Sequence, residues 1–307
     1  MIYNRWMSFI KDDVKLNSLV IPGSHNAGTR NFPKMACCQD DDIYTQIQYG
    51  IRHFCIRLDT NKKGEIVICH GLSKGEPFRN VLSCIKKALE ENNTEFYIFD
   101  IREYYPQKIG PFRFKYKAEA AKVNKLLKEY IHPEINAFTE FDNISKVTMG
   151  DIRKSGKRYL LLNYQQDYDY SVACTHIFPW EKKVNGSHAE DFVKETLRFF
   201  DDYQTDGLYW FQTQQTPNFG VPVGLTSPRK LDEELRPHFK KLIDGIASNP
   251  FYLESANIIA GDFMTKDYMK VREILRLNIL KNNVIDSRKE EYSRGLEEDS
   301  VESYSVG

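Results

Sequence analysis

The sequence predicts one α/β domain, built as a distorted or incomplete (β/α)8 barrel of the TIM type. Apolar, β-branched or aromatic runs alternate with amphipathic helical stretches, which indicates a largely parallel sheet. Polar or ionisable residues follow nearly every one of these runs. The chain has 307 residues, and no Gly/Ser/Pro-rich linker divides it into two cores. We therefore expect residues 1–285 to form the barrel and residues 286–307, which are charged and serine-rich, to form a mobile tail.

The individual elements follow from the period of the apolar residues. Short runs that end at polar residues are expected strands, at Ser18 to Ile21, His53 to Leu58, Glu65 to Cys69, Glu95 to Ile101, Arg158 to Asn163, Gly207 to Thr213 and Ala256 to Gly261. Amphipathic stretches are expected helices, at Phe78 to Asn92, Phe112 to Ile131, Ala189 to Tyr203, Lys230 to Ala247 and Lys266 to Asn282.

Residues with reactive side chains gather where the expected strands end. In a barrel of parallel strands all these ends open on one face, where the active sites of such barrels lie. The set comprises His25, Arg57, Asp59, His70, Arg102, Glu103, Asn163, Gln212, Gln214 and Asp262. A strand end is also simply where solvent begins, and this explanation serves equally well for any single position. It is weaker for a set that contains two histidines and two arginines.

Composition excludes several classes of function. With 43 basic and 43 acidic residues, the chain has no net charge that would attract nucleic acid or an anionic membrane. The six cysteines lack the density of a disulfide scaffold, which favours a reduced, intracellular setting. We find no leader-like N-terminus and no apolar run of membrane-spanning length. We therefore expect a monomer that is cytoplasmic or peripheral to a membrane, while secretion without an N-terminal signal stays open.

Two segments present a histidine at the end of an apolar run. The first is Ile21-Pro22-Gly23-Ser24-His25-Asn26-Ala27-Gly28-Thr29, and the second is Glu65-Ile66-Val67-Ile68-Cys69-His70-Gly71. A histidine pair that spans a phosphodiester can act as general base and general acid. A carboxylate such as that of Asp262 can hold the base ring in the required tautomer. The guanidinium groups of Arg57 and Arg102 can contact phosphate oxygens, although each arginine alone is as readily explained as an ion-pair partner.

These segments carry a resemblance to a known family. The motifs IPGSHNAGT, YGIRHFCIRLDT, EIVICHG and FYIFDIREYY, over residues 18–105, resemble the X-domain of phosphatidylinositol-specific phospholipase C. IIAGDF at residues 258–263 resembles a late strand of that family. The order and spacing are more similar to the small, calcium-independent bacterial type than to the multidomain eukaryotic type.

The resemblance implies a role for each catalytic candidate. His25 would take the proton from the inositol 2-hydroxyl with Asp262 as its partner, and Arg57 would stabilise the phosphorane-like transition state. His70 would protonate the departing diacylglycerol oxygen, which gives diacylglycerol and a cyclic inositol phosphate. Arg102 falls near a family lysine that lines the pocket, and a shift of one position in the alignment would place Glu103 there instead. The implied partner is a phosphoinositide lipid at a membrane surface.

Three departures from the bacterial pattern leave other functions open. Asn26 and Cys55 stand where bacterial members commonly carry aspartate, which would weaken the acid half of the reaction. Asn163, or its neighbour Tyr164, stands where an arginine would contact the inositol ring. One alternative is therefore a catalytically weak barrel that binds phosphoinositides, and another is a phosphodiesterase for a different head group. We expect Asn26, Arg102, Asn163 and Asp59 to line the substrate site.

We expect no metal and no cofactor. Asn26 and Asp59 could ligate calcium, but Cys55, Arg57 and Arg102 occupy the carboxylate positions of the eukaryotic site, and guanidinium groups repel a cation. Adjacent cysteines such as Cys37 and Cys38 rarely share a metal or close a ring, so we expect no functional role for them. The remaining histidines are expected to be structural or on the surface: His53, His132, His176, His188 and His238.

Overall fold

Seven parallel strands form a curled, incomplete barrel in the computed structural model of the protein. The structure describes residues 2–103, 108–109, 112–113, 118–163, 167–173, 175–177, 189–202, 207–215 and 227–302. The order of the strands across the sheet is β8, β5, β2, β1, β11, β10 and β9. Within the described ranges no ladder joins β8 to β9, so the sheet stays open between them. The strands are β1 (Ile21–Ser24), β2 (His53–Thr60), β5 (Tyr97–Glu103), β8 (Tyr159–Asn163), β9 (Thr175–Ile177), β10 (Leu208–Gln212) and β11 (Ile258–Gly261). The predicted fold class is confirmed.

One predicted parallel strand runs the other way. β2 continues beyond the rim of the sheet, and β3 (Ile66–His70) turns back along this extension in antiparallel register, with Thr60 opposite Ile66 and Leu58 opposite Ile68. β4 (Ser73–Pro77) adds a third, antiparallel strand beside β3. The run from Glu65 to Cys69 was therefore correctly predicted as a strand, but its direction in a parallel sheet was not. A second small sheet pairs β6 (Lys108–Ile109) with β7 (Phe112–Arg113).

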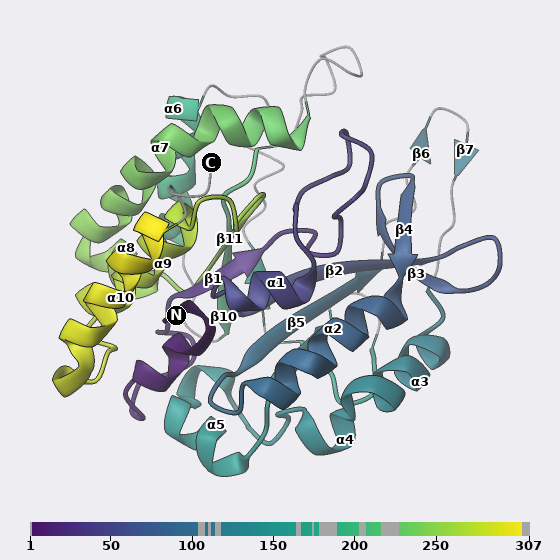
Figure 1. Ribbon diagram of the computed structural model, residues 1–307, viewed down its shortest axis with the longest axis horizontal. Coiled ribbons are helices and arrows are strands. Elements are labelled where there is room, and N and C mark those ends of the chain that lie inside the picture. The colour runs from purple at the N-terminus through teal and green to yellow at the C-terminus, as the bar shows by residue number, and fades with distance from the viewer. Residues whose placement is uncertain are drawn as a thin grey trace.

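Helices cover the outer surface of the sheet (Figure 1). α2 and α3 lie together beside β2 and β5, and α9 packs on β1 with α7 behind it. The helices are α1 (Ile43–Gln48), α2 (Phe78–Glu91), α3 (Ala120–Ile131), α4 (Pro133–Asn136), α5 (Met149–Ser155), α6 (Ala189–Arg198), α7 (Pro228–Ser248), α8 (Pro250–Ser255), α9 (Met269–Leu280) and α10 (Lys289–Glu302). Short 3-10 helices are η1 (Tyr3–Phe9), η2 (Ile144–Lys146), η4 (Phe199–Asp202) and η5 (Asp286–Arg288). None of the described helices is both long enough and apolar enough to cross a membrane.

Two predicted helices differ at their starts. The helix predicted from Phe112 begins at Ala120, because Phe112 and Arg113 form β7 and residues 114–117 lie outside the described residues. The helix predicted from Lys266 begins at Met269, after Asp267 and Tyr268 adopt positive φ angles of 58° and 54° that interrupt helical geometry. The expected helix ends are within one or two residues of the observed ends in both cases.

The N-terminal end of the sheet is closed by η1. Trp6 is fully buried there, and its indole N–H donates to the Gly50 carbonyl at 2.9 Å. Arg52 and Glu95 form a buried ion pair at 2.7 Å just before β2 and β5 begin, and Arg52 also donates to three backbone carbonyls. A buried pair needs such extra partners to offset its desolvation. This end of the sheet is therefore structural, and the reactive residues lie at the other end.

The expected mobile tail is wrong for most of its length. Residues 286–302 form η5 and α10, and Tyr292 on α10 is fully buried against Phe9, with ring centroids 5.6 Å apart. The Tyr3 hydroxyl donates to the Leu296 carbonyl at 3.0 Å. Two apolar side chains one helical turn apart suffice to dock this helix, although the rest of its surface is charged. Residues 303–307 lie outside the described residues.

Candidate active site

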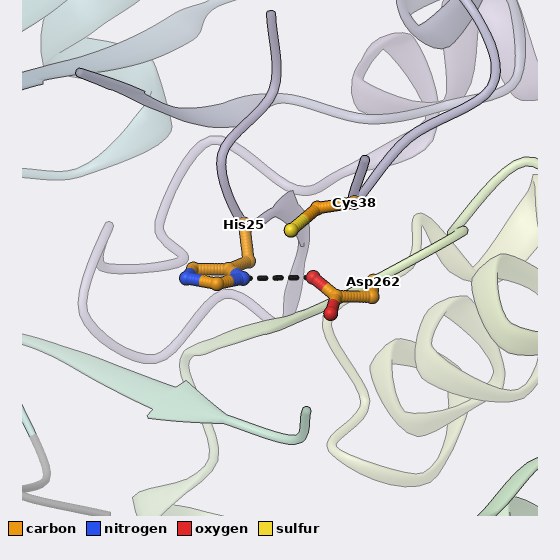
Figure 2. A group of neighbouring side chains, drawn as sticks. All are labelled: His25, Cys38 and Asp262. Carbon is orange, nitrogen blue, oxygen red and sulfur yellow. Dashed lines mark hydrogen bonds and ion pairs between the residues drawn. The ribbon is translucent and has the colours of Figure 1, made fainter. Parts of the chain in front are cut away.

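His25 and Asp262 meet because of the register between β1 and β11. Ser24 pairs with Gly261 in the parallel ladder, so the next residue of each strand stands beside the other where both strands end. The ring Nδ1 of His25 lies 2.7 Å from the carboxylate Oδ1 of Asp262, and only 5% and 4% of the two residues are exposed (Figure 2). A carboxylate at this distance fixes the ring orientation and holds the proton on Nδ1.

The turn after β1 uses residue types that suit its backbone. Asn26 adopts a φ angle of 47°, in the left-handed region that asparagine tolerates better than most residues. Its backbone carbonyl accepts a hydrogen bond from the Thr29 hydroxyl at 2.8 Å, and its side-chain amide lies 3.5 Å from the sulfur of Cys38. Asn26 is therefore a buried part of the site wall, next to His25.

His70 reaches the same place from the antiparallel strand β3. Its ring lies 6.4 Å from that of His25, measured between centroids, at an interplanar angle of 81°. Its Nδ1 lies 2.8 Å from the Ala36 carbonyl, which can only accept, so this nitrogen carries a proton. In the neutral ring the other nitrogen, Nε2, then has the free lone pair. The two histidines thus face one another with one nitrogen of each anchored.

Arg57 supplies positive charge to this face without a fixed partner. It lies on β2, and within the described part of the chain it forms no hydrogen bond or ion pair. Its guanidinium acts on both rings, because it lowers the pKa of His25 and of His70. A guanidinium without a counter-charge beside two imidazoles is suited to an anionic ligand.

Arg102 stands in a different environment. It donates to both oxygens of Asp100, at 3.1 Å and 2.8 Å, and its guanidinium carbon lies 4.5 Å from the centroid of the Trp210 ring. Arg102 still lowers the pKa of His25, although less than Arg57 does. Its charge is thus near the histidines, while its hydrogen-bond donors are partly committed to Asp100.

Burial sets the protonation of the three central groups. It lowers the pKa of His25 well below its ordinary value, and Arg57 and Arg102 add to this. It also lowers the pKa of His70 to about 4, with a further contribution from Arg57. Burial raises the pKa of Asp262 to about 7, which the positive charge of Lys270 partly opposes. Both rings are therefore neutral near pH 7 in the absence of an anion.

Two residues predicted to line the substrate site are bonded elsewhere. Asp59 is buried and paired with Lys74 of β4 at 2.7 Å, and it also accepts from the Thr60 backbone N–H. The Asn163 side chain donates to Asp167 at 3.1 Å and to Ser171 at 2.7 Å. Among the described contacts neither residue touches His25, His70 or Asp262, so their role in binding stays a prediction. Glu103 ends β5. Tyr164, which the resemblance offers in place of Asn163 at the ring-contacting position, lies outside the described residues, as do Cys174 and His188.

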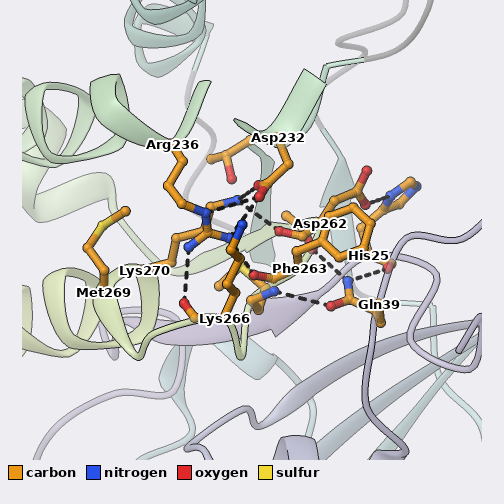
Figure 3. A network of polar contacts seen from close by, with 12 residues as sticks. His25, Gln39, Asp232, Arg236, Asp262, Phe263, Lys266, Met269 and Lys270 are labelled. Carbon is orange, nitrogen blue, oxygen red and sulfur yellow. Dashed lines mark hydrogen bonds and ion pairs between the residues drawn. The ribbon is translucent and has the colours of Figure 1, made fainter. Parts of the chain in front are cut away.

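A buried polar network behind the site was not predicted (Figure 3). The Gln39 amide donates to the carbonyls of His25 and Gly261, at 2.8 Å and 2.9 Å, and so joins the ends of β1 and β11. Lys270 is 1% exposed, forms an ion pair with Asp232 and donates to the Asp262 carbonyl at 2.8 Å. No local pattern marks Gln39, because its partners are distant in sequence. Lys270 stands among the apolar residues of one face of α9, and this was the one sign in the sequence that pointed to the network.

The search of protein-family models finds no match for this chain. Among solved structures, the fold is similar to that of phosphatidylinositol-specific phospholipase C from Listeria monocytogenes, with a TM-score of 0.66 and 20% identity over 90% of this chain and 98% of that chain. A variant of the Staphylococcus aureus phosphatidylinositol-specific phospholipase C gives a TM-score of 0.68 and 16% identity over 89% of this chain and 97% of that chain. At these identities the likeness establishes the fold.

Proposed function

We propose that this protein is a phosphodiesterase that cleaves phosphatidylinositol or a related glycerophosphoinositide, without a metal, by acid–base catalysis. The observation that carries the proposal is the convergence of two neutral imidazoles and the guanidinium of Arg57, which has no ion-pair partner in the described part of the chain, at one end of the sheet. The carboxylate of Asp262 is bound to the first ring. The likeness in fold to bacterial phosphatidylinositol-specific phospholipases C supports it.

The first step uses the free nitrogen of His25. Its Nε2 is buried and has no hydrogen-bond partner among the described residues, while Nδ1 is held by Asp262, so Nε2 is free to accept a proton. In the proposed reaction it removes the proton of the inositol 2-hydroxyl, and the 2-oxygen then attacks phosphorus. Asp262 stabilises the imidazolium that forms, as a carboxylate does in a catalytic triad.

The second step needs positive charge and a proton donor. Arg57 faces the phosphate oxygens, where negative charge grows as the 2-oxygen bonds to phosphorus. His70 gives its proton to the diacylglycerol oxygen as the bond from that oxygen to phosphorus breaks. The bound phosphodiester anion raises the pKa of His70, which favours the protonated ring in the complex. The products are diacylglycerol and a cyclic inositol phosphate, and the proton balance is closed when His25 returns its proton to solvent.

Asn163 bears on which head group the site accepts. Asn163 takes the place of a ring-contacting arginine in the resemblance, and its amide is engaged by Asp167 and Ser171. This observation favours a second candidate, a phosphodiesterase of the same mechanism that acts on another head group. With either head group, the protein would bind its lipid at a membrane surface as a peripheral protein.

The decisive test is turnover of lipid vesicles by the purified protein. Phosphorus NMR would follow the cyclic phosphate from phosphatidylinositol, with phosphatidylcholine, phosphatidylglycerol and lysophosphatidylinositol as the comparison panel. We expect His25→Ala and His70→Ala each to abolish the cyclic product while the circular dichroism spectrum is unchanged. Binding of inositol lipid without turnover of any head group would instead favour the catalytically weak binding barrel.

A further inference from the structure

The thiol of Cys38 lies in the wall of the candidate site, beside the His25 and Asp262 pair. It is 1% exposed, and its backbone is fixed on both sides, because Cys38 N–H donates to the Thr29 hydroxyl at 3.0 Å and Phe263 N–H donates to the Cys38 carbonyl at 2.8 Å. One nitrogen of His25, the sulfur of Cys38 and one oxygen of Asp262 all lie within 4.8 Å of one another (Figure 2). The acid–base mechanism has no use for this sulfur.

The three donor atoms select one class of cation. Imidazole nitrogen, thiolate and carboxylate are the ligands of zinc, whereas calcium takes about six to eight oxygens. Bonds of about 2.0–2.3 Å place neighbouring ligands of a tetrahedral zinc ion about 3.3–3.8 Å apart. The pair at 2.7 Å would open by about 1 Å and the wider pairs would close by at most about 1.5 Å, through rotation of these side chains. A fourth position is left for water.

The negative charges of Cys38 and Asp262 can offset the repulsion between Arg57 and a bound cation. Cys38 as thiolate and Asp262 as carboxylate together cancel the charge of a divalent ion, so Arg57 faces a neutral complex. Asn26 directs its side-chain N–H towards the Cys38 sulfur at 3.5 Å, and such an outer contact supports a thiolate ligand. Gln39 holds the backbones that carry His25 and Asp262 together.

We propose that His25, Cys38 and Asp262 bind a zinc-class divalent cation, and that this cation inhibits the phosphodiesterase. The binding stands on the ligand geometry alone, and the inhibition rests on the proposed function. A metal on Nδ1 of the neutral His25 ring leaves its proton on Nε2, so Nε2 can no longer accept one. The thiol proton of Cys38 leaves to solvent, the hydrogen bond from His25 to Asp262 is replaced by two metal bonds, and no electron is transferred.

Cobalt provides a direct readout of the ligands. One equivalent of Co²⁺ should give the thiolate-to-cobalt charge-transfer absorption of the wild-type protein, and Zn²⁺ should displace it. Cys38→Ser should lose the band and bind Zn²⁺ about 100-fold more weakly or worse, since loss of an outer contact alone costs about 10- to 100-fold. Cys37→Ser is the matched control, because the Cys37 thiol donates to the Gln39 carbonyl instead and lies outside the ligand set, so its band should persist.

The activity arm separates the inference from the proposed function. With phosphatidylinositol vesicles, Zn²⁺ should inhibit wild type and Cys37→Ser, a chelator should restore turnover, and Cys38→Ser should resist inhibition. Should Cys38→Ser fail to fold by circular dichroism, Asp262→Asn takes its place in the Co²⁺ titration and should lose affinity. No charge-transfer band in wild type, or an equal band in Cys38→Ser, overturns the site. A band in a protein without turnover overturns the proposed function and leaves the metal site standing.

Discussion

His25 and His70 face each other at 6.4 Å although they end strands that run in opposite directions. β1 runs parallel to β2 and delivers His25 at the rim of the sheet. β2 runs on past the rim, and β3 returns along it, so His70 comes back down to the level of His25. The β2–β3 hairpin thus fixes the position of His70, the proposed acid, whereas the parallel strands fix the position of His25, the proposed base.

The first prediction concerns the pairing of His25 with Asp262. Asp262→Asn keeps the size of the side chain but removes the charge that stabilises the imidazolium. We expect kcat to fall by about 10²- to 10⁴-fold, the range that a general base contributes. Steady-state turnover of phosphatidylinositol measures it. Asp244→Asn on α7, a carboxylate paired with Lys240 and Arg276 away from the site, should retain wild-type turnover.

The second prediction concerns Arg57, whose guanidinium has no hydrogen-bond or ion-pair partner where the chain is described. Arg57→Gln removes the charge beside both imidazoles, and we expect a fall in kcat of about 10²- to 10³-fold, as for loss of one donor to a developing oxyanion. KM should change much less, because this charge is needed most in the transition state. Arg30→Gln, which breaks partly buried pairs with Asp42 and Glu76, is the control and should keep the wild-type kcat. A change confined to KM would assign Arg57 to ground-state binding alone.

Much of this arrangement could be predicted from the sequence. Parallel strands that end in reactive residues must place those residues on one face, so the meeting of His25 and Asp262 followed from the fold class. The direction of β3 did not, because an apolar run reads the same in parallel and antiparallel pairing. Gln39 was missed because its contacts join segments far apart in the chain. No role was expected for Cys38, whose position beside His25 and Asp262 the sequence does not show. The tail was mispredicted because two buried residues, Tyr292 and Leu296, outweigh its charged composition.

We expect His53 to make the free energy of unfolding depend on pH. It is fully buried against Trp210, and neither ring nitrogen has a hydrogen-bond partner among the described side chains and backbone. Burial lowers its pKa to about 4, although Asp100, 4.0 Å from Nε2, opposes this shift. The unfolded state, with an ordinary imidazole pKa of about 6.5, binds more protons between pH 6.5 and 4. This histidine therefore makes stability fall as pH drops through that window, by about 3 kcal/mol in full, with no effect above it.

Denaturant unfolding at several pH values measures the pH dependence predicted for His53. The variant His53→Leu removes the titrating group, so its free energy of unfolding should depend less on pH than that of wild type between pH 6.5 and 4. Ile56→Leu, which changes a buried residue of the same strand that does not titrate, should keep the wild-type slope. Equal slopes for wild type and His53→Leu would contradict the prediction.

Gln39 should position the two catalytic residues without taking part in the reaction. Gln39→Leu removes the donor to the His25 carbonyl and the acceptor of the Met264 N–H, at a cost of about 1–3 kcal/mol for each buried group. The Gly261 carbonyl loses the Gln39 amide but still accepts from the His25 N–H at 3.1 Å. We expect a lower free energy of unfolding together with a fall in kcat larger than any change in KM. The Gln48 side chain accepts one hydrogen bond, from Asn4 at 3.4 Å, in the described part of the structure, so Gln48→Leu should change neither stability nor kcat. A purely structural role would lower stability and leave the kcat of the folded protein intact.

Helix α10 should be part of the folded domain. Its Tyr292 packs edge-on against Phe9, and its hydroxyl donates to the Leu275 carbonyl at 3.3 Å. Truncation after residue 288 exposes the surface of η1 and α9 that this helix covers, and loss of a buried tyrosine alone costs about 3–5 kcal/mol by analogy with other large aromatic side chains. We expect a lower Tm and a lower midpoint in urea, with the candidate site unchanged. Truncation after residue 302 is the control, and equal stability of the two shortened chains would restore the mobile tail.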